Sequence, residues 1–222
     1  MFFNKLLATF SSRRKRAKQY SKVSGSQEQI NRLRKGLELR PDQVDTRRIA
    51  PVFVPTTFFA SGNWPGPYAC LRIREISLTW AVLLPDQTMR YVDFGMKEYW
   101  DAVSIDWKVL ALQNLLEHSG DKPGTHELRR SNGEVYGIAL MHPDGIGPSR
   151  LLLRDKLSAI FPGGYQVALP EMSCAYAFSV TLEKKELATV QNLVDNCYKK
   201  GTRPLAPGIY APDDLLPEIE PS

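Results

Sequence analysis

The chain has 222 residues, of which 43% are hydrophobic and 10% aromatic, and this is enough to bury the core of one large domain or two small ones. It contains no run of about 18 or more apolar residues, which excludes a membrane-spanning helix at the level of sequence. Three widely spaced cysteines, Cys70, Cys174 and Cys197, argue against a disulfide framework and favour a reducing, cytoplasmic compartment.

The net charge of +5 arises at the N-terminus. Seven of the 29 lysines and arginines lie in residues 1–26, which contain no acid, so the remaining 196 residues hold 22 basic and 24 acidic side chains. Binding of nucleic acid by the folded part would need a basic surface there. The charge distribution therefore argues against nucleic acid as a partner.

Residues 1–26 combine an apolar beginning with a basic cluster. Such a segment suits peripheral contact with an anionic membrane, with aromatic side chains in the headgroup region and cations on phosphate. The residues expected to make this contact are Phe2, Phe3, Arg13, Arg14, Lys15 and Arg16. An organellar presequence and a solvated tail are the alternatives.

Residues 27–39 have the apolar spacing of one helix face. Residues 49–59 form a β-rich apolar run, which Pro51 and Pro55 interrupt. Because proline cannot donate to a neighbouring strand, we expect an edge strand followed by a turn. The next loop carries Trp64, for which two interpretations are open: a binding residue, or an aromatic side chain that covers the edge of the core.

Residues 69–84 and 88–94 predict a β-hairpin, with a change of register near Ser77 in its first strand. Glycine at position 95 is expected to end the second strand.

A helix is then predicted from an N-cap at Ser104 to about His118, with Gly120 as its stop. We expect its buried face to carry Val109, Leu112 and Leu116.

The Asn132–Gly133 pair predicts a second hairpin, closed by a type I′ turn. Residues 153–197 then predict a helix, two strands and a helix. The strand from Cys174 has small residues on one face, and we expect it to be covered on both faces. The final helix is expected to bury the apolar residues Leu187, Val190, Val194 and Cys197.

These elements predict an α+β fold, with a mixed or antiparallel sheet, hairpins and two to four packed helices. Residues 27–212 are expected to form a single domain. Within it, residues 204–210 should run back across the domain as an extended segment. Residues 213–222 are expected to form an acidic, proline-rich tail.

The sequence offers little catalytic chemistry. It contains no CxxC, HExxH, GxSxG or phosphate-binding glycine loop, and no cofactor or metal is predicted. Of the three histidines, only His142 has a nearby acid, Asp144. The two side chains could act as a general base and the group that orients it, but Pro143, Asp144 and Gly145 also have the composition of an ordinary turn.

The order of several short motifs resembles the YtpQ-like family of bacterial proteins, whose domain has no assigned function. The residues that carry the resemblance are residues 49–53, Tyr91-Val92-Asp93-Phe94, residues 111–115, Val167-Ala168-Leu169-Pro170 and residues 204–210. The resemblance covers roughly residues 28–212. It implies an α+β domain and brings no catalytic residues; where the family has a charged pair after the Val-Ala-x-Pro strand, this chain has Glu171-Met172-Ser173.

The sequence as a whole therefore predicts a non-enzymatic domain that binds an unknown protein partner, with the loops of Trp64 and His142 as the first surfaces to consider. An enzyme of unknown reaction, centred on His142 and Asp144, is the alternative.

Overall fold

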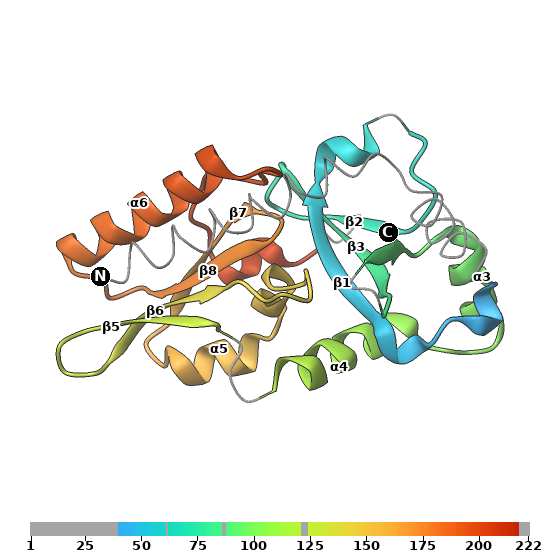
Figure 1. Ribbon diagram of the computed structural model, residues 1–222, viewed down its shortest axis with the longest axis horizontal. Helices are drawn as coiled ribbons and strands as arrows, with labels where there is room; N and C mark the ends of the chain where they lie inside the picture. The colour runs from blue at the N-terminus through green and yellow to red at the C-terminus, as the bar shows by residue number, and fades with distance from the viewer. Residues whose placement is uncertain (1–39, 61, 86–87, 121–123, 218–222) are drawn as a thin grey trace. The chain divides into compact units, whose positions relative to one another are not determined.

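A computed structural model describes residues 40–60, 62–85, 88–120 and 124–217. The chain divides into two compact units, residues 1–40 and residues 41–222, and the elements below belong to the second. They comprise four α-helices and two four-stranded antiparallel sheets, which confirms the α+β class (Figure 1). The helix expected over residues 27–39 lies outside the described residues.

The first sheet is organised around one long strand. Its members are β1 (Ile49–Pro55), β2 (Tyr68–Cys70), β3 (Ile76–Leu83) and β4 (Met89–Tyr91). β3 pairs with β1 on one side and with β2 and β4 on the other. The single strand predicted over residues 69–84 is wrong, because the chain reverses between Cys70 and Ile76. Leu71 and Ile73 remain buried within that turn, so the alternation of apolar residues continues through it and conceals the reversal.

β1 is an edge strand, as predicted, since among the described strands it pairs only with β3. Side chains satisfy two of its outward carbonyl groups. Asn114 Nδ2 donates to Ile49 O at 2.9 Å, and Ser149 Oγ donates to Pro51 O at 2.6 Å. Both donors are buried, so the edge is closed without a further strand.

The second sheet has the order β5-β6-β8-β7. Its strands are β5 (His126–Arg129), β6 (Val135–Leu140), β7 (Tyr165–Glu171) and β8 (Cys174–Ser179). In the chain, α5 (Arg154–Ile160) lies between β6 and β7, and α6 (Lys184–Lys200) follows β8. Every residue of β8 is buried, which confirms that this strand is covered on both faces.

The predicted hairpin between β5 and β6 is present, but the predicted turn type is wrong. A type I′ turn needs positive φ at two central residues. Gly133 has a φ of 87°, whereas Asn132 does not have a positive φ. Arg130 N instead donates to Glu134 O at 2.8 Å, which closes a three-residue loop with glycine in the left-handed position.

Two helices follow the first sheet, α3 (Phe94–Ala102) and α4 (Trp107–Ser119). The sequence did not predict α3: Gly95, expected to end a strand, lies in its first turn, where the Asp93 carboxylate accepts from Met96 N at 2.8 Å. The N-cap of α4 is Asp106 rather than Ser104, which has a φ of 58° in the preceding turn. Gly120 ends α4 as predicted.

The predicted buried face of α4 is wrong. Val109, Leu112 and Leu116 are 48%, 45% and 47% exposed, respectively. The inward side consists of Trp107, Ala111, Asn114, Leu115 and Ser119. Its rotation is fixed by the Asn114 amide, which donates to Thr46 O at 2.8 Å as well as to Ile49 O, and by a small alanine that allows close approach to β1.

α6 follows its prediction more closely. Val190, Val194 and Cys197 are buried against the second sheet, whereas Leu187, in the first turn, is 43% exposed and was wrongly expected in the core.

The 3₁₀ turn η4 (Pro148–Leu152) joins the two sheets, because it contacts β1, β8 and α4. Side chains from both sheets form one hydrophobic cluster around it.

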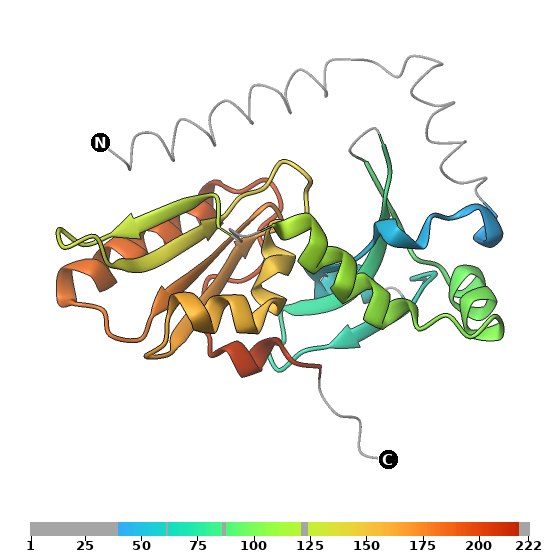
Figure 2. The ribbon, with the colours of Figure 1, turned by 90° about the horizontal axis from the view of Figure 1, so that it is seen from below.

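The C-terminal part of the chain returns across the second sheet. Ala206 N donates to Leu169 O at 3.1 Å and Tyr210 N donates to Val167 O at 2.8 Å, so the extended segment expected over residues 204–210 covers the free edge of β7. The start of the expected acidic tail is also folded: residues 212–215 form the 3₁₀ turn η5, with Leu215 only 2% exposed. Figure 2 shows this part of the chain, in red, against the folded body.

Candidate functional site

Trp64 lies at the edge of the core. Its ring meets those of Phe59 and Tyr91 edge-on, with 4.9 Å between ring centroids in each pair. The side chain is partly buried and packs against the central hydrophobic cluster. Its surroundings are those of an aromatic side chain that seals the core.

Asp144 is engaged by a buried arginine. Arg150, in η4, is fully buried and directs Nη2 to Asp144 Oδ2 at 2.7 Å and Nη1 to Asp144 Oδ1 at 3.3 Å. Ile146 N also donates to this carboxylate, at 3.1 Å. Burial raises the pKa of Asp144, but the hydrogen bonds and charge of Arg150 lower it more, so the pKa lies below its ordinary value of 3.8.

The Arg150–Asp144 ion pair also connects η4 to the end of α4. Arg150 Nη2 also donates to His118 O, at 3.3 Å, in the last turn of α4, and Lys156 Nζ donates to Gly120 O at the end of that helix. Two cations therefore lie at the negative end of the α4 dipole. His142 is close enough for its charge to help lower the Asp144 pKa, but the Asp144 carboxylate is directed to Arg150. Of the two residues expected to form a base and its orienting acid, Asp144 is thus the one paired with the buried Arg150.

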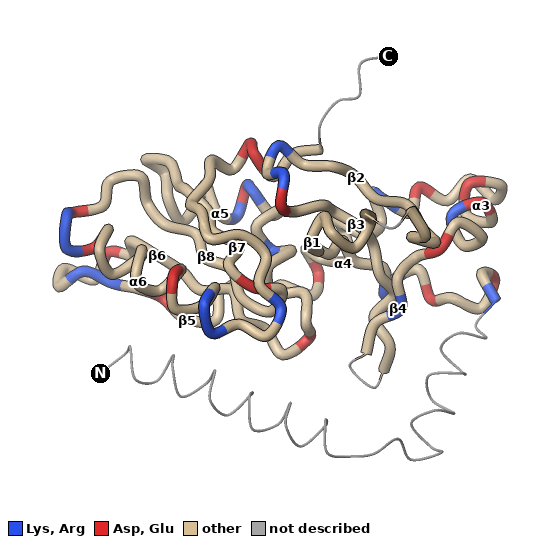
Figure 3. The backbone as a smooth tube through the Cα atoms, turned by 90° about the horizontal axis from the view of Figure 1, so that it is seen from above, with Lys and Arg blue, Asp and Glu red and all other residues tan. Residues whose placement is uncertain are grey.

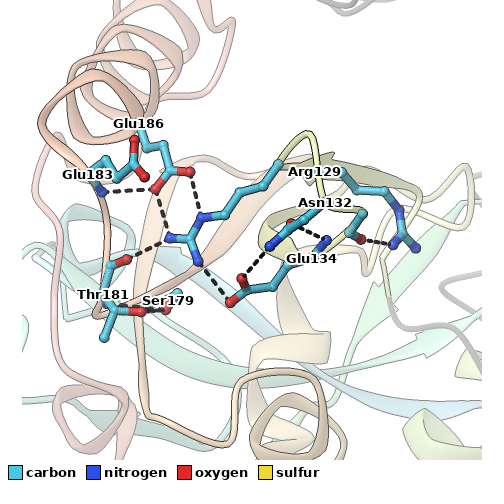
Figure 4. A network of polar contacts seen from close by, with 9 residues as sticks. Arg129, Asn132, Glu134, Ser179, Thr181, Glu183 and Glu186 are labelled. Atoms are coloured by element: carbon cyan, nitrogen blue, oxygen red, sulfur yellow. Dashed lines mark hydrogen bonds and ion pairs between the residues drawn. The ribbon is translucent and has the colours of Figure 1, made fainter.

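A second arginine network joins the β5–β6 hairpin to the start of α6 (Figure 4). Arg130 forms two parallel bonds to Glu186, Nε to Oε1 at 2.8 Å and Nη2 to Oε2 at 2.9 Å. Its Nη1 pairs with Glu134 at 2.8 Å, and its Nη2 also donates to Thr181 O at 2.7 Å. Hydrogen bonds from Arg130 lower the pKa values of Glu186 and Glu134, and these carboxylates raise the pKa of Arg130.

A cavity of about 360 Å³ lies beside this network. Its lining residues are Arg129, Arg130, Ser131, Asn132, Tyr136, Glu183, Lys185, Glu186 and Thr189. The cavity is lined by polar residues of both charges, and the Arg130 and Glu186 side chains in its wall form an ion pair with each other. Sequence reasoning indicated no site in this region. The signal available was the spacing of Glu183 and Glu186, which cap the first turn of α6 reciprocally.

The outward face of α4, defined as Val109, Leu112 and Leu116, is an exposed apolar surface. The spacing of these residues, i, i+3 and i+7, places them on one side of the helix. Exposed charged residues, Lys108 and Glu117, flank the outward face of α4. Lys108 Nζ lies 5.3 Å from the centroid of the Trp80 ring, where a cation–π contact holds it at one end of the helix. Sequence reasoning identified these three apolar residues but assigned them to the core.

Charges on the folded body are mixed. In the view of Figure 3, basic and acidic positions interleave along the described backbone. Within the described ranges, no three His, Cys, Asp or Glu residues form a group that could hold a metal ion, and no helix is long and apolar enough to span a membrane. The predicted membrane-contact residues in residues 1–26 lie outside those ranges.

The fold and these sites define an α+β domain with two antiparallel sheets and an apolar helix face turned outward. The chain has no match to a protein-family model, to a curated protein or to a solved structure.

Proposed function

We propose that this protein is a non-enzymatic interaction domain, and that its folded body binds another protein through the outward face of α4. The exposure of Val109, Leu112 and Leu116 carries the proposal, since nearly half the surface of each is in water while the opposite side of the helix is packed. Contiguous exposed apolar surface of this kind is typical of protein contact sites. Full burial of one such side chain contributes about 1.5–3 kcal/mol.

The test is site-specific photocrosslinking. The photoreactive amino acid p-benzoylphenylalanine is placed at Leu112, or at Gln191 on the exposed side of α6 as a matched control, and adducts from native lysate are identified by mass spectrometry. We expect a defined protein adduct at position 112 that is lost when Leu116→Asp is added. The same adducts at position 191, or adducts that survive Leu116→Asp, would contradict the proposal. Because Leu116 is about half exposed and lies near the negative end of the α4 dipole, this substitution should lower the free energy of unfolding of the free protein by no more than about 1 kcal/mol, so the protein stays folded.

Three further statements stay predictions from the sequence: a cytoplasmic location, membership of the YtpQ-like family, and contact of residues 1–26 with an anionic membrane. Flotation with vesicles that contain phosphatidylserine tests the last. The full chain should float with the vesicles and a chain that begins at residue 27 should not, and this difference should vanish in high salt.

A further inference from the structure

β2 has a free edge. The strand pairs with β3 on one side, and within the described ranges no strand pairs with the other. Trp80 O accepts from Val92 N at 2.9 Å, so even-numbered residues of β3 direct their backbone groups toward the side of β4 and β2. Leu78 therefore faces its partner Ala69, and the N–H and C=O groups of Tyr68 and Cys70 point to the free edge.

The C-terminal part of the chain already meets β2 at its end. Leu71 forms an isolated antiparallel bridge with Pro217. Because proline has no N–H, this pair cannot exchange hydrogen bonds, so a ladder continued past it would have its first hydrogen-bonded pair at positions 70 and 218. An antiparallel ladder continued from the bridge places residues 218, 219 and 220 opposite Cys70, Ala69 and Tyr68.

The sequence beyond Pro217 fits that register. Tyr68 and Cys70 are exposed, whereas Ala69 is half-buried against the core. Glu218, Ile219 and Glu220 alternate in the same phase, so the ladder puts Ile219 on the core side and both glutamates on the outer side. A shift by one residue would reverse this match.

Charge supports the same register. Arg72 is exposed and lies on the outer side of the chain, two residues after Cys70. In the ladder Glu218 is its diagonal neighbour, and opposite charges at such positions are favourable.

We propose that the free edge of β2 is a strand-acceptor site, and that its occupant is this chain's own segment 218–222. This contact lies beyond the interaction through α4 and closes an edge that would otherwise accept foreign strands. The same tail supplied by a second copy is the competing occupant, and the experiment separates the two.

The first test uses the native thiol of Cys70. In a hydrogen-bonded antiparallel pair the Cα atoms are about 5.5 Å apart, within the range that a disulfide spans. Under diamide, which takes up two hydrogens as the disulfide forms, Glu218→Cys should crosslink to Cys70 within one chain about tenfold faster than Ile219→Cys, which faces the other side. Equal rates, or crosslinks between two chains, would overturn the proposal.

The second test needs no new cysteine. In a chain that ends at Pro217, the amides of Tyr68 and Cys70 should exchange about tenfold faster than in the full chain, by NMR, while Ala69, bonded to β3, keeps its protection. Unchanged exchange at Tyr68 and Cys70 would overturn the proposal.

Discussion

α4 and α6 are both long helices packed on a sheet, but the sequence predicts the packed side of only one of them. α6 has one apolar stripe, and its residues Val190, Val194 and Cys197 are buried. α4 is apolar on both sides, so periodicity alone selects the wrong one, and the structure turns Leu112 outward. The comparison teaches that a polar side chain, here Asn114, can set the rotation of a helix that has apolar residues on two opposite sides.

The largest expected effect concerns Arg150, which binds Asp144 and the C-terminal end of α4. Arg150→Ala leaves the Asp144 carboxylate without its buried partner, and we expect a loss of about 3–5 kcal/mol in the free energy of unfolding, measured by urea denaturation. Arg154→Ala is the control: Arg154 and Asp213 are 46% and 59% exposed, so its loss should stay below about 1 kcal/mol. Equal losses for the two variants would show that η4 does not secure the helix.

Two adjacent leucines of α4 test its rotation directly. Leu115 is fully buried and Leu116 is 47% exposed. Leu115→Ala should lower the free energy of unfolding by about 2–5 kcal/mol and Leu116→Ala by no more than about 0.5 kcal/mol. Leu193→Ala in α6, at a 6% exposed position, should resemble Leu115→Ala. A similar cost at positions 115 and 116 would mean that α4 has no fixed inward side.

The smallest expected effect is on pH dependence. The folded-state pKa of Asp144 lies below its ordinary value of 3.8, so the ion pair with Arg150 stabilises the fold fully above that value. As the pH falls through the folded-state pKa, the carboxylate gains a proton and this contribution is lost. Asp144→Asn should therefore show a shallower decline in stability between about pH 4 and pH 2, by urea denaturation at each pH. An unchanged slope would assign the acid sensitivity to other carboxylates.

Local patterns predicted most of the second sheet. The alternation in β7 and β8, the glycine turn at Gly133 and the extended segment after Pro204 each follow from residues close in sequence. The first sheet was harder, because Leu71 and Ile73 maintain a strand-like pattern through a turn, and α3 begins at an aspartate that also suits the end of a strand.

The candidate sites depended on pairings that a single sequence does not encode. Asp144 has the sequence context of a turn residue, and only the fold brings the fully buried Arg150 to it. Likewise, Arg130 and Glu186 lie far apart in the chain and meet only when α6 packs on the hairpin. The outward face of α4 was visible as three apolar residues, but which side of the helix they occupy is decided by Asn114.

The path of the C-terminal segment imposes an order on biosynthesis. A nascent chain emerges from its N-terminus, so β7 is complete before residues 204–210 exist to cover its edge. Leu205, Ala206 and Leu215, all buried in the finished protein, also arrive last. The second sheet therefore reaches its final stability only after residues 204–215 have been synthesised, and until then the outer edge of β7 has no covering segment.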